Sequence, residues 1–278
     1  VILPKAGATA VLDIDYRKRR AVTATGTVQA QELVMATHSP KGVRMVHAQM
    51  PVHREYAIAL RGALRDPGPG IFWAKGDPSL SIRTLEARGE RFLVFAGQEH
   101  KLGLHDAKAA LAGLEAQARE LHPAGDVAYR WSAQNYRGAD GLPYIGRDTT
   151  GCFVATGFGT DGLIWGTAAA RIIAEEVLGR TREFAKLLKP TRVTPVKGAK
   201  NIADEVATMT KALVKDYITD RQQQALASLG AGEGAVVDSD DGAVAAWRAP
   251  SGEVFAVSPV CTHLGCKVHW NNVETSWD

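Results

Sequence analysis

CFVATGFGTDGLIWGTAAARIIAEEVLG, residues 152–179, is the stretch that says most about the fold of this chain. A short apolar run at 152–156 predicts a strand, and a helical pattern over 163–178 ends at Gly179. Three glycines between them have the G-x-G-x-x-G spacing of dinucleotide-binding loops: Gly157, Gly159 and Gly162. The stretch therefore predicts a strand, a tight loop and a helix whose N-terminus faces that loop.

The surroundings of the glycine loop do not complete a dinucleotide-binding unit. No second strand ending in an acidic residue follows the helix, and residues 180–200 are basic and contain prolines. The loop also follows a long β-rich region, whereas the dinucleotide motif normally opens its domain. From the residues alone two interpretations stay open, a cofactor loop and a turn that only lets the strand pack closely on the helix.

Alternating, β-branched segments before the loop predict strands at residues 10–16, 21–28, 32–37, 56–61, 79–83 and 91–96. The period changes at Asp106, a suitable N-cap, and a helix is predicted over 106–121 with Leu111, Leu114, Ala118 and Leu121 on one face. Residues 124–151 contain several glycines and predict a loop. We therefore expect residues 1–180 to form one domain, with a mixed, largely antiparallel sheet and two main helices.

Four stretches, in this order along the chain, resemble the D-amino-acid-oxidase/glycine-oxidase superfamily of FAD enzymes. They are LVMATHSP (33–40), FLVFAGQEHKLG (92–103), RWSAQNYRGADGLPYIGR (130–147) and the stretch 152–179. The resemblance implies that the late glycine loop and its helix lie against the pyrimidine side of the isoalloxazine. Free N–H groups and the helix dipole would there stabilise negative charge on the reduced flavin.

The resemblance assigns cofactor contacts to these residues of the glycine loop: Gly157, Gly159, Thr160, Asp161, Gly162, Leu163 and Ile164. Thr37 matches the strand end that touches the nucleotide side of FAD. Arg83 ends a strand that resembles the segment reaching the flavin face, where it would bind a substrate carboxylate, and a surface role is the alternative. Tyr136, with Tyr144, is a second candidate for the substrate side, and a buried packing role is the alternative. Cys152 and the histidines at 38, 53 and 100 are expected to be structural.

Cys-x-His-x-x-Cys, at residues 261–266, resembles the first half-motif of Rieske proteins. The resemblance implies that Cys261 and His263 bind different irons of a [2Fe–2S] cluster, and that Cys266 pairs with a cysteine of a second half-motif, C-x-C-H. A zinc site that adds His269 stays open as an alternative, as does a loop without metal.

Neither the second Rieske half-motif nor the family's pyrophosphate-binding loop occurs in the sequence, and position 1 is Val. We therefore expect the chain to be an internal piece of a longer protein. Without the second half-motif we expect this chain to hold no cluster, and the residues beyond about 258 to be poorly anchored. Packing there would depend on Leu264, Trp270 and Trp277 alone.

Composition excludes several classes of protein. With 45% hydrophobic and 23% charged residues, a net charge of +3 and three cysteines, the chain is neither a disulfide scaffold nor a nucleic-acid binder with a clustered basic face. No apolar run reaches the length of a membrane span, so we expect a cytoplasmic location without a membrane partner. The expected partners are a small-molecule substrate and an electron-transfer protein.

The predicted fold class is α+β, with a small all-β domain at the end. We expect an oxidoreductase domain over residues 1–188, a linker and amphipathic helix over 189–225, and a truncated Rieske-type domain over 226–278. The predicted function is FAD-dependent oxidation of an amine or amino acid, with electrons leaving singly through the [2Fe–2S] centre. The alternative is a catalytically silent structural or binding fragment without cofactor.

Overall fold

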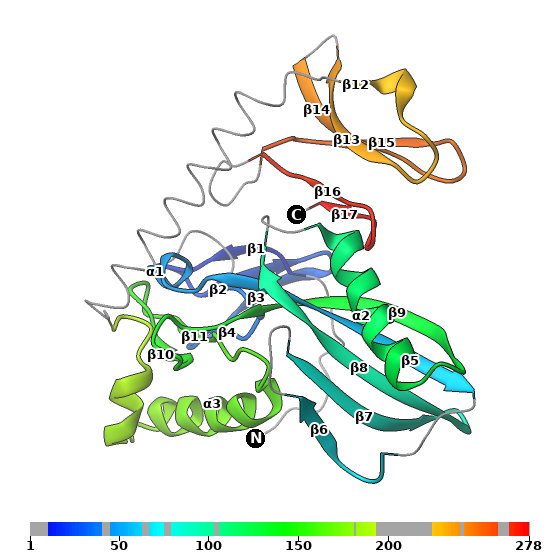
Figure 1. Ribbon diagram of the computed structural model, residues 1–278. Coiled ribbons are helices and arrows are strands. Elements are labelled where there is room, and N and C mark those ends of the chain that lie inside the picture. Colours follow the sequence, from blue (N-terminus) through cyan, green and yellow to red (C-terminus); the bar gives the residue numbers. More distant parts are fainter. Residues whose placement is uncertain are drawn as a thin grey trace. The chain divides into compact units, whose positions relative to one another are not determined.

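The computed structural model describes residues 11–40, 45–62, 67–74, 79–102, 106–180, 182–192, 224–239, 242–260 and 267–277. The chain divides into two compact units (Figure 1). Unit 1 comprises residues 1–51 and 136–203, and unit 2 comprises residues 52–135 and 204–278. Each unit therefore combines two stretches that lie far apart in the sequence.

Unit 1 contains two three-stranded sheets. An antiparallel meander is formed by β1 (Val11–Asp15), β2 (Arg20–Thr23) and β3 (Gly26–Gln29). The second sheet has the order β10 (Tyr144–Arg147), β11 (Phe153–Thr156), β4 (Val34–Met35), with β11 antiparallel to β10 and parallel to β4. The described part of the unit also contains α1 (Met45–Ala48), α3 (Gly162–Val177) and the 3-10 helix η1 (Glu183–Leu188).

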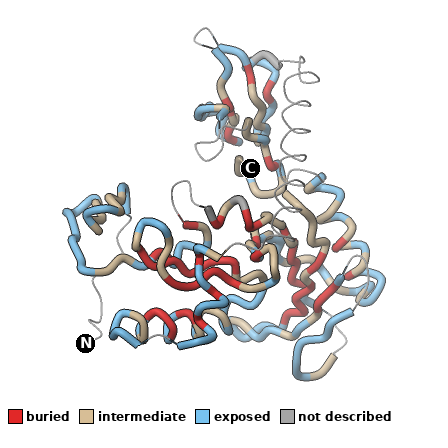
Figure 2. The backbone as a smooth tube through the Cα atoms, turned by 90° about the vertical axis from the view of Figure 1, so that its left-hand side faces the viewer, coloured by how far each residue is buried: buried red, intermediate tan, exposed pale blue. Residues whose placement is uncertain are grey.

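Helix α3 and η1 cover one face of the second sheet of unit 1, and the apolar core lies between them. Ile145 of β10 and Phe153 of β11 are almost completely buried there against Ile172 and Ile173 of α3. Figure 2 shows this burial as a red band along the helix and the strands. The predicted helix and its end at Gly179 are confirmed, because Gly179 has a φ of +74°, which favours glycine after a helix.

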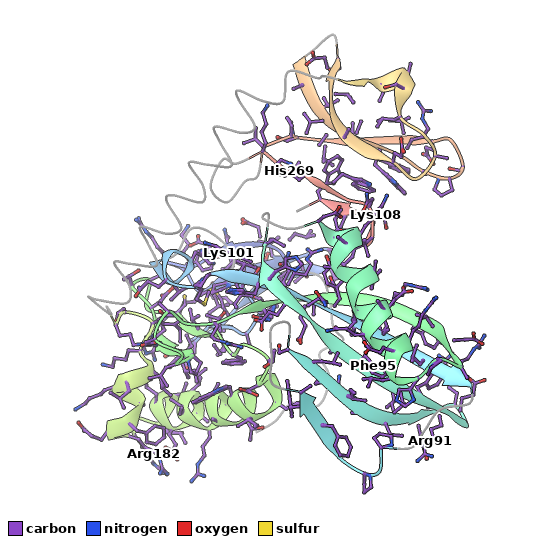
Figure 3. All side chains as sticks on the ribbon, viewed as in Figure 1. Arg91, Phe95, Lys101, Lys108, Arg182 and His269 are labelled. Carbon is purple, nitrogen blue, oxygen red and sulfur yellow. The ribbon has the colours of Figure 1, made fainter. Side chains whose placement is uncertain are left out.

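Unit 2 is built on a five-stranded sheet with the order β6-β7-β8-β5-β9. Its strands are β5 (Val52–Gly62), β6 (Ile71–Ala74), β7 (Leu80–Ala87), β8 (Glu90–Lys101) and β9 (Gly125–Tyr136), and the last residue of β9 belongs to unit 1. Helix α2 (Ala107–Leu121) packs on this sheet, with Leu114 and Ala118 against Phe95 (Figure 3). The predicted N-cap is confirmed, since the Asp106 carboxylate accepts hydrogen bonds from the N–H groups of Lys108 and Ala109.

The described residues from 224 to 277 in unit 2 form β-strands and one short 3-10 turn. A four-stranded sheet has the order β12 (Gln224–Ala225), β13 (Gly234–Ser239), β14 (Gly242–Arg248), β15 (Val254–Val257), and the turn η3 (Leu226–Ser228) follows β12. An antiparallel hairpin of β16 (Trp270–Asn271) and β17 (Ser276–Trp277) ends the described chain. The α+β class, with largely antiparallel sheets and few helices, is thus as predicted.

Several predicted elements differ from the structure. The described residues of 11–180 form three sheets, of which the antiparallel five-stranded sheet is the largest. The expected strand 21–28 is two strands joined by a turn. Residues 125–136, predicted as loop, form the long strand β9, because pairing with β5 across the sheet outweighs the glycine signal that follows it. Leu121, expected on the same helix face as Leu114 and Ala118, is 47% exposed, because α2 ends there.

The start of the expected linker is part of unit 1, because Arg192 is bound to the loop before β10. The predicted helix at 202–218 lies outside the described residues, as do Cys261, His263, Leu264 and Cys266. The expectation that the chain beyond 258 is poorly anchored is wrong for residues 267–277. Asn271 there is only 4% exposed and Trp270 stacks on Trp247.

Candidate functional site

The parallel pairing of β4 and β11 brings two of the predicted cofactor segments to one edge of the sheet. Val34 pairs with Phe153 and Met35 with Val154, so both strands end on the same side. Thr156 of β11 donates a hydrogen bond from its hydroxyl to the backbone carbonyl of His38. The segment that contains Thr37 therefore lies directly beside the start of the glycine loop.

Two glycines of the loop are required by its backbone conformation. Gly157 and Gly159 have φ values of +76° and +59°, a region that disfavours side chains. A Cβ on Gly157 would also lie 3.3 Å from both Met50 Sδ and Tyr144 Cδ2. The N–H of Gly159 donates to the carbonyl of Tyr136 over 2.8 Å, which fixes the loop against the end of β9.

Gly162 differs from these two glycines, because it begins α3 and a Cβ there would meet no described atom within 4 Å. Among the described residues Asp161 forms no side-chain hydrogen bond that caps the helix. The N–H groups of the first helical turn have no acceptor inside the helix and so point out of it. Leu163 and Ile164 are 91% and 70% exposed, unusually high for apolar side chains in a folded domain.

Taken together, this edge of unit 1 offers backbone N–H groups, the positive end of a helix dipole and exposed apolar surface. A planar, largely apolar group that carries hydrogen-bond acceptors on one edge and gains negative charge fits these features. The isoalloxazine of FAD is such a group. Free space at Gly162 is the observation that fits it most directly, since a ring edge could approach the backbone there.

A cluster of polar side chains lies beside the same edge of unit 1. The ring of His38 contacts that of Tyr136 edge to face, with centroids 4.8 Å apart, and His38 has a φ of +66°. Tyr136 forms a hydrogen bond with Ser39, whose Oγ is 3.2 Å from Nε2 of His47. Burial raises the pKa of the Tyr136 hydroxyl, although the bond to Ser39 opposes this, so Tyr136 is neutral at physiological pH.

Not all predicted site residues come together in one unit. Tyr136 contacts the cluster just described, and Tyr144 is fully buried beneath the loop. Arg83 is exposed on β7 in unit 2, paired across the sheet with Ile71 and Val94. Its role toward a substrate stays a proposal.

Two further residues lie beside the glycine loop. His38 was expected to be structural, which stays a prediction, and Arg137 was not considered from the sequence. The antiparallel bridge between Arg137 and Phe158 places the Arg137 guanidinium along the glycine loop, with Nε 3.1 Å from the position of a Cβ on Gly159. The sequence contained a signal for both, because each directly follows a residue assigned to the site, Thr37 or Tyr136.

Two arginine–carboxylate pairs hold the strands that carry the site. Both guanidinium Nη atoms of Arg147 bind the Glu32 carboxylate, at 2.7 and 2.8 Å, and this bonding lowers the pKa of Glu32. Arg192 binds both Asp140 oxygens at 2.9 Å and the carbonyls of Leu142 and Pro143. Burial tends to raise the pKa of Asp140, but hydrogen bonds from Arg192 and a backbone N–H outweigh it and lower the pKa.

Comparison with curated proteins finds two kinds of relative. A protein of Bacillus subtilis (strain 168) named "Putative Rieske 2Fe-2S iron-sulfur protein YhfW" is 27% identical over 278 residues, which is 97% of this chain and 54% of that protein. A D-amino acid dehydrogenase of Sinorhizobium medicae is 29% identical over 184 residues, 62% of this chain and 43% of that protein. The chain thus spans about half the length of the curated relatives it matches.

Solved structures share the fold at lower identity. L-proline dehydrogenase from P. horikoshii matches with a TM-score of 0.50 and 16% identity, over 66% of this chain and 53% of that one. Fructosamine oxidase from Aspergillus fumigatus matches with a TM-score of 0.51 and 13% identity, over 70% and 52%. In the described part of the chain, no helix combines the length and apolarity needed to cross a bilayer.

The family model described as "DAO: FAD dependent oxidoreductase" matches residues 6–176, which is more than half of the chain. The match includes both strand ends, the glycine loop and nearly all of α3. The chain therefore belongs to the DAO family of FAD-dependent oxidoreductases.

Proposed function

We propose that this chain is part of an enzyme that oxidises an amine or amino acid by hydride transfer to FAD and passes the electrons singly through a Rieske-type [2Fe–2S] centre. The observation that carries the flavin part is the start of α3, with open space at Gly162 and exposed apolar side chains at Leu163 and Ile164. FAD, when bound, supplies the hydride acceptor. Residues 160–164 would bind its pyrimidine edge through N–H groups.

The substrate side is proposed from unit 1. Tyr136 is neutral, ordered by Ser39 and next to His38, so it can donate a hydrogen bond to a substrate without adding charge. Arg137 offers an exposed guanidinium beside the glycine loop, which suits a carboxylate. Arg83 remains a proposed second cation for the same purpose. An amino-acid substrate is favoured because a curated relative is named a D-amino acid dehydrogenase.

The iron–sulfur part rests on the C-terminal sequence. Cys261 and His263 are proposed as ligands, one for each iron, and the remaining ligands would come from a C-x-C-H segment after Asp278. Two observations support this proposal. Four short strands precede the motif, three of them (β13–β15) in antiparallel pairing, and the relative that aligns over 97% of the chain is named as a Rieske protein. The proposed domain limits along the sequence are 1–188, 189–225 and 226–278, with the first linker residues, up to Arg192, bound to the oxidoreductase domain.

Flavin absorbance, iron and acid-labile sulfide of the full-length protein test the proposal. We expect about one flavin and two irons per chain, with a Rieske-type EPR signal after reduction. Cys261→Ser should abolish the iron and leave the flavin, while Cys152→Ala, at a buried cysteine of unit 1, should leave both. The 278-residue chain alone should contain no stoichiometric iron. A colourless full-length protein would contradict the proposal.

A further inference from the structure

We infer that the β16–β17 hairpin is an intramolecular docking element. Its tip, residues 272–275, binds β5 and β9 of the five-stranded sheet, and its base packs on the sheet β12–β15. Both contacts lie inside unit 2. The hairpin thereby holds the sheet β12–β15, here called the C-terminal β module, against the five-stranded sheet of unit 2.

The tip is held by a buried charge. The side chain of Arg54 on β5 is only 3% exposed, and its Nη1 donates to Oε2 of Glu274 over 3.1 Å. The other carboxylate oxygen of Glu274 accepts a hydrogen bond from the hydroxyl of Ser132 on β9. A buried guanidinium is stabilised by an anion beside it, so removing the Glu274 carboxylate should weaken this contact.

The tip is shaped to present this carboxylate. The side chain of Asn271, 4% exposed, accepts hydrogen bonds from the N–H groups of Val273 and Glu274 at 3.0 and 3.2 Å. Thr275 completes the turn with a φ of +52°. Val273 packs against the apolar cluster that includes Leu114 of α2. The tip therefore makes an apolar contact through Val273 and a charged contact through the neighbouring Glu274.

The base of the hairpin is anchored on the other module by aromatic rings. Trp270 stacks on Trp247 of β14 with centroids 5.8 Å apart, and Trp277 meets Trp270 edge to face at 5.0 Å. Gly234 of β13 lies directly under the Trp270 ring, where a Cβ would be 2.4 Å from Cδ2. The base of the hairpin therefore packs closely on the β module, while its tip binds β5 and β9.

An open pocket lies beside this attachment. Its volume is about 620 Å³, and it is lined by Leu111, Arg130 and Trp131 on the side of the sheet and α2 and by Asn272, Val273, Glu274 and Ser276 on the hairpin. Among the described residues, the ion pair, the Ser132 hydrogen bond and the Val273 contact join the tip to the sheet and α2. We expect a single substitution at Glu274 to loosen the tip.

The docking matters for the Cys-x-His-x-x-Cys loop, because only three residues separate Cys266 from Trp270. Figure 3 labels one of them, His269, at the start of the hairpin. The relevance of the docking to an iron–sulfur centre rests on the proposed function. The docking itself requires no cofactor.

Hydrogen exchange followed by mass spectrometry on the 278-residue chain tests the docking. Glu274→Gln, which keeps the shape and removes the charge, should speed exchange about tenfold in residues 270–277 and in β5 and β9 around Arg54 and Ser132. Ser132→Ala should give a smaller increase in the same peptides. Glu253→Gln, at an exposed glutamate of the same module, is the control and should change neither.

Unchanged exchange in β5 and in residues 270–277 of Glu274→Gln would overturn the inference. So would a uniform increase that includes β13 and β14, because it would give Glu274 a general role in stability. An Arg54→Met, Glu274→Gln double variant should be no worse than Arg54→Met alone, since the two residues act as a pair. Hydrogen exchange is measured without flavin or iron. A negative result would therefore contradict the docking but not the proposed function.

Discussion

The Thr156 hydroxyl donates a hydrogen bond to the backbone carbonyl of His38, and this bond links two segments proposed to contact FAD, the one with Thr37 and the glycine loop. His38 has a φ of +66°, a conformation that costs a residue with a side chain about 1 kcal/mol or more. Thr156 is 2% exposed, so its bond is made in a dry environment. The hydrogen bond from Thr156 therefore helps to hold His38 in its left-handed backbone conformation.

Thr156→Val should lower the free energy of unfolding of the chain by about 1–2 kcal/mol, because the His38 carbonyl loses its buried donor. It should also weaken FAD binding by the full-length protein, since the segment with Thr37 is no longer held. Urea unfolding and flavin titration measure the two effects. Thr167→Val is the matched control, at an exposed threonine that bonds only within α3, and should change stability by less than about 0.5 kcal/mol.

The Gly162→Val variant tests whether Gly162 is needed for FAD binding or for packing of the chain. In the chain itself the new side chain meets no described atom within 4 Å, so unfolding should change by no more than about 1 kcal/mol. In the full-length protein the same change should reduce flavin content or shift the flavin potential. Gly138→Ala should behave in the opposite way and destabilise the fold, because its Cβ would lie 2.1 Å from the Leu142 carbonyl oxygen. Normal flavin content and potential in Gly162→Val would contradict the assignment.

Arg192→Ala should destabilise unit 1 by about 2 kcal/mol, since the Asp140 carboxylate and two backbone carbonyls lose their donor. Arg192→Lys should recover only part of this, because an ammonium cannot reproduce the planar fork or its stacking on Tyr144. Urea unfolding measures both variants against Lys186→Ala, which removes an exposed pair with Glu183. Equal stability of Arg192→Ala and Lys186→Ala would show that residues 189–192 are a free linker.

Glu32 gives a pH dependence with a defined sign. The hydrogen bond from Arg147 lowers the pKa of Glu32 below its ordinary value of 4.5 in the folded chain. A carboxyl group with a lowered folded pKa stabilises the fold above its unfolded pKa, and this contribution is lost as pH falls. The stability difference between the chain and Glu32→Gln should therefore be largest at neutral pH and shrink below about pH 4.5. Urea unfolding at a series of pH values measures it, and a constant difference would contradict the assignment.

The sequence predicted the local features of the site well. Gly157, Gly159 and Gly179 identify backbone positions with positive φ, and the strand–loop–helix around them forms as expected because the signal is local. The N-cap at Asp106 follows from a side chain that bonds its own neighbours. Features of this kind depend on residues within a few positions of each other.

Non-local features could not be predicted in the same way. The position of Thr37 beside the glycine loop depends on β4 pairing with β11, about 120 residues later. Strand β6 follows a run of prolines and glycines and exposes Ile71 and Trp73, so its pattern resembles a loop. The docking of Glu274 on Arg54 joins residues 220 positions apart, and no periodicity in the sequence indicates it.

Anaerobic reductive titration of the full-length protein, followed by flavin absorbance and EPR, tests the central claim most directly. If FAD and a [2Fe–2S] centre act in one chain, reduction should take up about three electron equivalents, two at the flavin and one at the iron–sulfur centre. A Rieske-type EPR signal should appear as the flavin bleaches, and Cys261→Ser should lose that signal together with one equivalent. Flavin that bleaches with about two equivalents and no paramagnetic iron signal in the unaltered protein would contradict the account.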